Sequence, residues 1–449
     1  MSNSTKRYII EGKIPLKGKV RISGAKNAAV KEIIASLLTQ DSLVLENVPD
    51  ISDVAVDLEV VKALGVEVKK QGRNSLSLRS RQNLATEIPE ALSCQTRSAL
   101  LTMGPLLARE GKVVLPALGG CLIGARPFDR HLAGLESLGA KFEIDGKKVV
   151  GKAKRLRGGQ VVFGKNTVMG TENILLAAVV AEGETEVLGA AQEPEVDDLI
   201  ILLKDMGARI ERSASDPRRV FIQGVQTLSG AKHKVLPDRN EAVTFAVAAA
   251  VTRGDLLLTG INVPDLTSFL AKLERIGVSY EIMGDDLRVC VDEQAIFHSI
   301  DVETAPHPGF KTDWQQPLTV LLTQAIGKSY IHETVFDDRW KYLSELRKFG
   351  AHVRLLTPSQ LGKPFNPGDY NFDWKGKDQP KTFAEVFGPT ELIGAKVTIT
   401  DLRAGAALVL AALSARGTSE VYGVEHIDRG YEDFEKKLLA LGAAIRVVG

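Results

Sequence analysis

The chain has 449 residues, of which 25% are charged, and its formal net charge is +1. The length predicts two or three domains, because a single hydrophobic core rarely grows beyond about 300 residues. The balanced charge argues against a strongly basic nucleic-acid binder, although local basic clusters could still bind small anions.

The N-terminal residues, MSNSTKRYIIEGK, contain no apolar run of the kind found in a secretory leader. The longest apolar run, residues 242–251, is far shorter than the roughly 20 residues that cross a bilayer. Three widely spaced cysteines, Cys94, Cys121 and Cys290, fit a reducing compartment better than a disulfide scaffold. We therefore expect a cytoplasmic protein with neither membrane nor nucleic acid as a partner, and we favour a monomer.

One short phrase recurs six times along the chain, first as VKALGVEV, and each time a helical stretch ends in glycine and a strand follows. A glycine in this place suits the left-handed conformation that closes a helix. The glycines are Gly65, Gly139, Gly207, Gly277, Gly350 and Gly442. The first five are about 70 residues apart, and the last gap is roughly 20 residues longer.

Each phrase is preceded by a helix of small apolar residues, a strand, and an acidic turn that begins a second helix. The small-residue helices are expected within residues 27–40, 98–110, 173–183, 242–254, 318–327 and 405–417. Because these helices have little polar surface, they should be buried on nearly all sides. The sequence therefore predicts an α/β protein with a helix–strand–helix–strand repeat, in which sheets surround buried helices.

Three repeats around an axis make one domain, so six repeats predict two. We assign domain I to residues 1–25 and 235–449, and domain II to residues 26–234. The longer last gap indicates an insertion at residues 357–391, which is rich in Pro, Gly, Lys and Asp and should be a surface loop.

Two residues have the surroundings of reactive groups. Cys121 lies between glycines in the loop 115–131, and Arg126 follows closely, so nearby positive charge would lower the pKa of the thiol. The alternative is an inert loop thiol. Asp313 follows a Pro-His-Pro stretch and could act as a general base, or it could cap the helix that follows.

Seven phrases, in order, resemble the enolpyruvyl transferases, most closely the branch that uses UDP-N-acetylglucosamine. They are ISGAKNAA, GGCLIGARPFD, VLPDRNEAVTF, TAPHPGFKTD, ETVFDDR, TDLRAGAALVLA and HIDRGYE. The resemblance implies two inside-out α/β barrel domains of three repeats each. It also implies transfer of enolpyruvyl from phosphoenolpyruvate to the 3-hydroxyl of UDP-N-acetylglucosamine, with release of phosphate, in peptidoglycan precursor synthesis.

By this resemblance, Cys121 donates a proton and can form an adduct with phosphoenolpyruvate, Asp313 is the general base, and Lys26 is catalytic. The implied substrate-binding residues are Lys26, Asn27, Arg97, Arg126, Pro127, Phe128, Asp129, Arg130, Asp313, Val335, Arg339, Arg403 and Arg429. Taken singly, each arginine is more often a surface ion pair. Because the early and late residues belong to different domains, the substrate is expected to lie between the domains and favour their closure.

No cofactor and no metal are expected. No glycine-rich dinucleotide motif follows a strand, and the seven histidines show no metal-ligand spacing.

Two phrases depart from the resemblance on the nucleotide side. CQTR replaces a Lys-Thr-Met-Arg-like phrase, so that Cys94 stands in place of a cation, and VMGTE lacks a hydroxyl at Val168. Two alternatives therefore stay open. One is an enolpyruvyl transferase for another acceptor such as UMP, and the other is a catalytically silent paralogue that binds nucleotide sugars.

Overall fold

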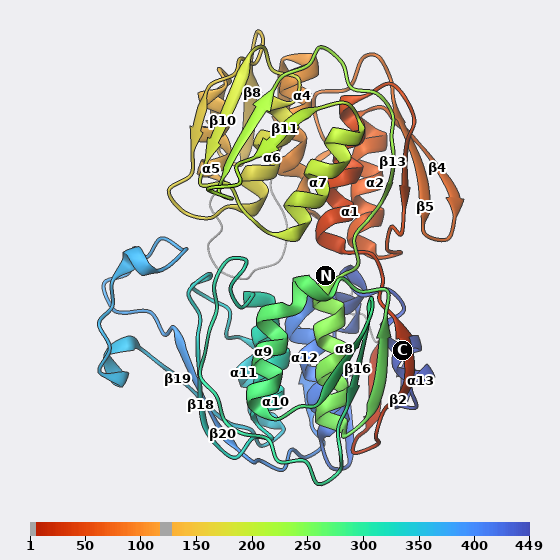
Figure 1. Ribbon diagram of the computed structural model, residues 1–449, viewed down its shortest axis with the longest axis vertical. Coiled ribbons are helices and arrows are strands. Elements are labelled where there is room, and N and C mark those ends of the chain that lie inside the picture. Colours follow the sequence, from red (N-terminus) through yellow and green to blue (C-terminus); the bar gives the residue numbers. More distant parts are fainter. Residues whose placement is uncertain (1–5, 117–127) are drawn as a thin grey trace. The chain divides into compact units, whose positions relative to one another are not determined.

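The computed structural model describes residues 6–116 and 128–449, which belong to two compact units (Figure 1). Unit 1 contains the described residues 6–23 and 237–449, and unit 2 contains residues 24–116 and 128–236. No helix in these described ranges has both the length and the apolar character needed to cross a membrane.

Unit 2 holds three repeats of two helices and three strands. The first comprises α1 (Lys26–Ala35), β3 (Leu43–Glu46), α2 (Ser52–Leu64), β4 (Val66–Gly72) and β5 (Ser75–Ser80). The second comprises α4 (Met103–Glu110), β6 (Lys112–Leu115), α5 (Asp129–Ser137), β7 (Lys141–Asp145) and β8 (Lys148–Lys152). The third comprises α6 (Val168–Ala178), β10 (Glu184–Leu188), α7 (Pro194–Asp205), β11 (Arg209–Arg212) and β12 (Arg219–Gln223).

Shorter elements connect these repeats. They are η1 (Ser36–Leu38), α3 (Glu90–Ser93), η2 (Ser98–Thr102), β9 (Gln160–Val162) and β13 (Lys232–Lys234).

Unit 1 repeats the same plan. It begins with β1 (Arg7–Glu11) and β2 (Lys17–Arg21), and continues with α8 (Arg239–Thr252), β14 (Asp255–Thr259), η3 (Val263–Leu266), α9 (Thr267–Ile276), β15 (Tyr280–Met283) and β16 (Asp286–Cys290). The next repeat comprises β17 (Val302–Glu303), η4 (Thr312–Trp314), α10 (Gln315–Leu322), β18 (Gly327–His332), α11 (Tyr342–Lys348), β19 (His352–Leu356), η5 (Pro358–Leu361), η6 (Pro367–Asp369) and β20 (Phe383–Gly388). The last comprises β21 (Lys396–Thr398), α12 (Leu402–Ser414), β22 (Thr418–Tyr422), η7 (Val424–Arg429), α13 (Phe434–Ala440) and β23 (Ala444–Val448).

The strands of the described residues form six small sheets, three in each unit. Their orders are β13-β3-β5-β4, β6-β8-β7, β11-β12-β10-β9, β15-β16-β14-β2, β17-β18-β20-β19 and β21-β22-β1-β23. In the three-stranded sheet, a single parallel bridge from Glu87 to Val114 stands where the other sheets have a fourth strand. Each of these sheets thus contains one strand that the four-element repeat did not predict and that is antiparallel to both of its neighbours, and five of the six also contain a parallel edge strand.

The small-residue helices are confirmed as the centre of each unit. Every residue of α8 and of α12 is buried, and these helices pack against each other and against α10, as Figure 1 shows for unit 1. The reason lies in their composition, because alanine and glycine leave room for close backbone approach on every side. All six repeat glycines have a positive φ, between 89° and 110°, as predicted for helix ends.

The predicted surface loop at residues 357–391 is only partly correct. Its residues 383–388 form β20, which lies between β18 and β19 in the middle of a sheet. The extra residues therefore enlarge the β19–β20 hairpin loop, and Tyr370 and Phe372 within that loop are buried. The composition of residues 357–391 did not indicate this strand, because the sequence FAEVFG directly follows a polar, lysine-rich stretch.

Candidate active site

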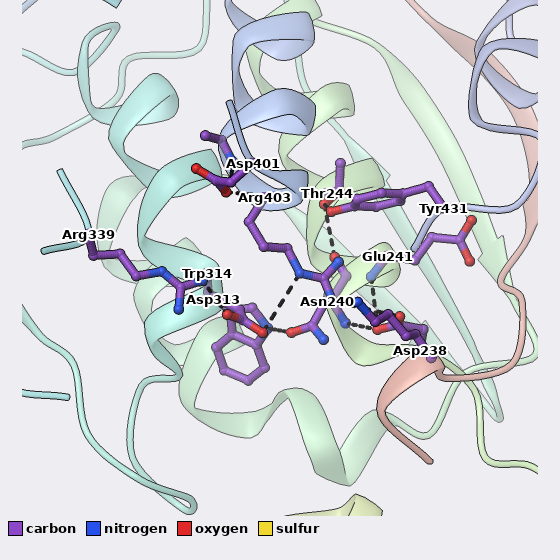
Figure 2. Close-up of polar contacts among 12 residues, drawn as sticks. Asp238, Asn240, Glu241, Thr244, Asp313, Trp314, Arg339, Asp401, Arg403 and Tyr431 are labelled. Atoms are coloured by element: carbon purple, nitrogen blue, oxygen red, sulfur yellow. Dashed lines mark hydrogen bonds and ion pairs between the residues drawn. The ribbon is translucent and has the colours of Figure 1, made fainter. Parts of the chain in front are cut away.

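Asp313 lies in unit 1 between two arginines from different elements (Figure 2). Its side chain belongs to η4, and its Oδ1 accepts a hydrogen bond from Arg339 Nη2, in the segment that precedes α11. Its Oδ2 lies 3.7 Å from Nε of Arg403, in the first turn of α12. The structure therefore brings together three of the predicted residues, with Arg339 and Arg403 on either side of the Asp313 carboxylate.

The two guanidinium groups determine the ionisation of Asp313. Burial would raise the pKa of its carboxyl, but Arg339, Arg403 and Lys311 outweigh that effect and hold the pKa well below its usual range. The group is therefore an anion at neutral pH. Helix α10 has Trp314 at its N-cap without a side-chain cap bond, so the capping alternative for Asp313 is not the arrangement observed.

Arg403 is fixed by the residues that surround it. Asp401 caps α12 by accepting hydrogen bonds from Arg403 N at 3.1 Å and Ala404 N at 3.0 Å. The Arg403 guanidinium lies over the Tyr431 ring, 5.2 Å from its centroid, and 4.0 Å from an oxygen of Asp238. Its Nη1 is buried and has no hydrogen-bond partner among the described residues, so it is able to donate to an anionic ligand.

Glu333 is a residue that the sequence reasoning missed, although ETVFDDR contains it. It is fully buried, and its Oε2 accepts a hydrogen bond of 2.7 Å from Thr312 Oγ1, next to Asp313. Its Oε1 accepts a hydrogen bond of 2.8 Å from the backbone N–H of Val335. One carboxylate therefore joins the loop that carries Asp313 to the loop that carries Val335.

The first turn of α8 supplies three further polar groups that were not predicted singly. Asp238 caps this helix, and its Oδ1 accepts a hydrogen bond of 2.7 Å from Asn240 N. Asn240 accepts a hydrogen bond of 3.1 Å from Trp314 Nε1 (Figure 2). Glu241 forms an ion pair with Lys437 at 2.5 Å. The phrase VLPDRNEAVTF carried the signal, since an aspartate before an apolar helix is a typical N-cap.

In unit 2, Lys26 is the first residue of α1 and forms an ion pair with Asp53 in the first turn of α2. Both side chains are largely buried. Asn27 follows Lys26 and is half-buried. The beginning of α1 therefore presents a cation and an amide at a helix N-terminus, which is a usual arrangement for binding anions.

Hydrogen bonds to α2 hold the segment that carries Arg97. Arg97 is half-buried and directly precedes η2, between Thr96 and Ser98. The Thr96 and Ser98 hydroxyls lie 2.5 Å apart, and Ser98 donates a hydrogen bond of 2.5 Å to Asp57 Oδ1. Burial raises the pKa of Asp57 to about 7, with opposing contributions from hydrogen bonds and Lys26.

The remaining predicted residues have varied surroundings. Phe128 packs against the core of unit 2, Asp129 is exposed in the first turn of α5, and Arg130 Nη1 donates a hydrogen bond of 3.3 Å to the Asn166 carbonyl. Arg429 ends η7 and is half-buried. Cys121, Arg126 and Pro127 lie outside the described residues.

The two residues that depart from the family pattern differ in their exposure to solvent. Cys94 is exposed at the end of α3, and Val168 is half-buried at the beginning of α6. Cys290, at the end of β16, is also exposed.

Comparisons with known proteins agree in the family and in the fold. A sequence model of EPSP synthase (3-phosphoshikimate 1-carboxyvinyltransferase) matches residues 10–438. The enolpyruvyl transferase NikO from Streptomyces tendae has a TM-score of 0.85 and 25% identity, with 99% of each chain covered. An EPSP synthase from Acinetobacter baumannii, at 18% identity and a TM-score of 0.72, shares the fold over 99% of this chain and 100% of that one. The predicted enolpyruvyl transferase fold is therefore confirmed.

Two curated relatives are more similar in sequence. The UDP-N-acetylglucosamine 1-carboxyvinyltransferase of Koribacter versatilis is 40% identical over 446 residues, which cover 99% of this chain and 96% of that protein. The protein of the same name from Magnetococcus marinus is 42% identical over 443 residues and 99% of both chains. With this identity over nearly the whole length of both proteins, the chain belongs to the UDP-N-acetylglucosamine 1-carboxyvinyltransferase family of enolpyruvyl transferases.

Proposed function

We propose that this protein transfers the enolpyruvyl group of phosphoenolpyruvate to the 3-hydroxyl of UDP-N-acetylglucosamine, releasing phosphate, in the cytoplasmic synthesis of peptidoglycan precursors. The observation that carries the proposal is the Asp313 carboxylate between Arg339 and Arg403. This arrangement combines a base with two cations. The reaction needs a base to remove the proton of the acceptor hydroxyl, and it needs cations because phosphoenolpyruvate carries a phosphate and a carboxylate.

The proposed reaction has two steps. The acceptor oxygen adds to C2 of phosphoenolpyruvate while its proton passes to Asp313, and C3 takes up a proton from Cys121. Phosphate then leaves from C2 and takes up the proton held by Asp313, while C3 returns a proton to the Cys121 thiolate, which restores the double bond. Asp313 is ionised at neutral pH and can therefore accept the hydroxyl proton.

Through the two arginines, substrate binding would change the pKa of Asp313. In the structure they hold the pKa of Asp313 low, which makes it a weak base. An anionic substrate that binds Arg403 Nη1 and shares Arg339 would draw positive charge away from Asp313 and raise its pKa. The carboxylate would thus become a stronger base only when the substrate is bound.

Lys26, Asn27 and Arg97 are proposed to bind substrate anions from unit 2. The Lys26–Asp53 ion pair supports this role, because a lysine held by a single carboxylate keeps further N–H groups for a phosphate. Cys121 and Arg126 are proposed as proton donor and anion ligand on the basis of the family phrase alone.

An enolpyruvyl transferase for a different nucleotide acceptor remains the second candidate. It is favoured by the likeness to NikO and by the residues at Cys94 and Val168, both of which lie on the predicted nucleotide side. The identities of 40% and 42% to relatives named for UDP-N-acetylglucosamine favour the first candidate.

The decisive experiment measures phosphate release from phosphoenolpyruvate with UDP-N-acetylglucosamine or UMP as acceptor, and identifies the product by mass spectrometry. We expect turnover with UDP-N-acetylglucosamine and a loss of about 10²- to 10⁴-fold in kcat for Asp313→Asn. Asp285→Asn, an exposed turn residue between β15 and β16, is the matched control and should keep full activity. Turnover with UMP alone would favour the second candidate, and no phosphate release with either acceptor would indicate a silent paralogue.

A further inference from the structure

Three side chains from three elements of unit 2, one of them α1, lie close together in its interior. Within residues 6–116 and 128–449, Glu32 of α1, Asp198 of α7 and His233 of β13 offer ligand atoms that all lie within 4.8 Å of one another. His233 Nε2 is 3.2 Å from Asp198 Oδ1 and 3.6 Å from Glu32 Oε1. All three residues are more than nine-tenths buried. None of them belongs to the proposed active site.

Among the described residues, the cluster has fewer hydrogen-bond donors than its carboxylate oxygens require. Both carboxylate oxygens of Glu32 are buried and have no hydrogen-bond partner within residues 6–116 and 128–449, and Nε2 of His233 can donate only one proton toward two carboxylates. The neighbouring cation on α1, Lys31, is already paired with Glu172. Buried carboxylates without donors are costly, so a further positive group at this point would relieve a real deficit.

The spacing of the ligand atoms fits a small metal ion. Bonds of about 2.1 Å from zinc to nitrogen and oxygen place tetrahedral ligands roughly 3.4 Å apart. The observed separations of 3.2 and 3.6 Å lie on either side of that value. A dication, two carboxylates and a neutral imidazole also sum to zero charge, which suits a buried site.

The surrounding groups orient the ligands as outer partners do in metal sites. The second oxygen of Asp198 accepts a hydrogen bond of 3.1 Å from Leu236 N, which turns Oδ1 toward the cluster. Asp205 Oδ2 lies 4.0 Å from His233 Nδ1, on the side of the ring away from Glu32 and Asp198. Carboxylates that face the second nitrogen of a ligating histidine are common around bound metals.

We propose that unit 2 binds one divalent transition-metal ion, with zinc the best match, through Glu32, Asp198 and His233. Water would complete the tetrahedron. The imidazole disfavours magnesium, which prefers six oxygen ligands. The ion would fasten α1 to α7 and β13, and its role would be to stabilise unit 2.

Sequence spacing could not indicate this site, because its residues lie on separate elements far apart in the chain. The alternative to a metal ion is a proton shared by His233 and the two carboxylates. The following experiment distinguishes the metal ion from the proton.

The test uses the full chain with Cys94, Cys121 and Cys290 changed to serine, so that thiols cannot bind zinc, after treatment with a chelator. Calorimetric titration with zinc chloride should show one saturable site. Glu32→Gln should weaken binding more than about 100-fold, because it removes a ligand charge while keeping the shape of the side chain. His352→Gln, at an exposed histidine, is the matched control and should bind like the parent.

A second readout is thermal unfolding. Zinc at 100 times its Kd should raise the midpoint of the parent by about 5 °C or more and leave that of Glu32→Gln unchanged. Asp198→Asn should repeat the result if Glu32→Gln fails to fold. The proposal is overturned if the parent shows no saturable binding, if both ligand variants bind like the parent, or if His352→Gln loses binding as well; the first result would assign the site to the shared proton.

Discussion

The carboxylates of this protein differ in pKa because their neighbours differ. Asp313 is held below its usual pKa by Arg339 and Arg403, which outweigh burial. Asp57 is fully buried, and its pKa rises to about 7 because the hydrogen bond from Ser98 and the charge of Lys26 do not compensate for the loss of water. Two aspartates that the sequence does not distinguish therefore have opposite effects on stability as the pH changes.

Asp57 should make the protein less stable as the pH rises. In the unfolded chain its pKa is about 3.9, so between that value and the folded pKa near 7 only the folded protein holds the proton. The free energy of unfolding should therefore fall from pH 5 to pH 8. Asp57→Asn should remove a decrease of the order of 2 kcal/mol over that range.

Urea denaturation of the parent and of Asp57→Asn at several pH values tests this prediction. The difference between the two proteins isolates Asp57 from Glu32 and Glu172, whose pKa values are also raised by burial. Equal slopes of stability against pH in both proteins would contradict it.

At the residue scale, motifs located the charged groups but not their partners. Asp313, Arg339 and Arg403 were expected in one site because each lies in a family phrase, and the structure brings them together. Glu333 and Asp57 were missed because each acquires its role from a partner more than 20 residues away in the sequence. The roles proposed for Cys121, Arg126 and Pro127 stay predictions.

At the scale of elements, small residues allow the central helices to approach closely. Gly104 of α4 lies against α6, where its backbone N–H donates a hydrogen bond of 2.8 Å to Asn173 Oδ1. A Cβ atom at Gly104 would lie 2.6 Å from the Asn173 carbonyl oxygen, closer than atoms pack in proteins. The glycine is therefore required by the helix contact rather than by a turn.

Gly104→Ala should destabilise the protein by about 2 kcal/mol, because separating α4 from α6 outweighs the better helix propensity of alanine. Gly72→Ala is the control, since a Cβ atom there meets no atom within 4 Å, and its effect should stay within about 0.5 kcal/mol. Chemical denaturation measures both variants. A loss at Gly104 no greater than that at Gly72 would show that the helices can separate freely.

The periodicity of small residues identified the helices reliably, whereas several strands escaped it. The strands β5, β8 and β12 each form a hairpin with the predicted strand just before them. Because the turn between the two strands is short, the sequence of each hairpin resembles a single strand followed by a polar stretch. The edge strands β9, β13 and β17 have only two or three residues. Segments so short carry no pattern, and their pairing depends on the neighbouring strand.

At the scale of the whole molecule, the part of the chain that the structure describes has two hydrophobic cores, one in each unit. The core of unit 2 draws its buried residues from Ala25 to Val235, and that of unit 1 draws them from residues 8–22 and 242–445. The connecting strands are exchanged, because β2 precedes α1 but pairs with β14, while β13 precedes α8 but pairs with β3. Each unit therefore has the contents of an independent folding domain.

We expect the fragment of residues 24–236 to fold without the rest of the chain, because it contains every residue of its core and all strands of its three sheets. Circular dichroism should show a cooperative thermal transition, and Gly104→Ala should lower its midpoint. A fragment that melts gradually, with no effect of the substitution, would show that unit 2 depends on unit 1.

The sequence by itself determined the sixfold repeat, the buried helices with their glycine ends, and the family. These features depend on residues close together in the chain, and local backbone preferences and apolar periodicity express them directly. Only the tertiary structure decided the position of β20, the exchange of β2 and β13, the link from Glu333 to two loops, and the cluster of Glu32, Asp198 and His233. Each of these joins residues that are distant in sequence, and such partnerships form only when the core closes and fixes which helix faces meet.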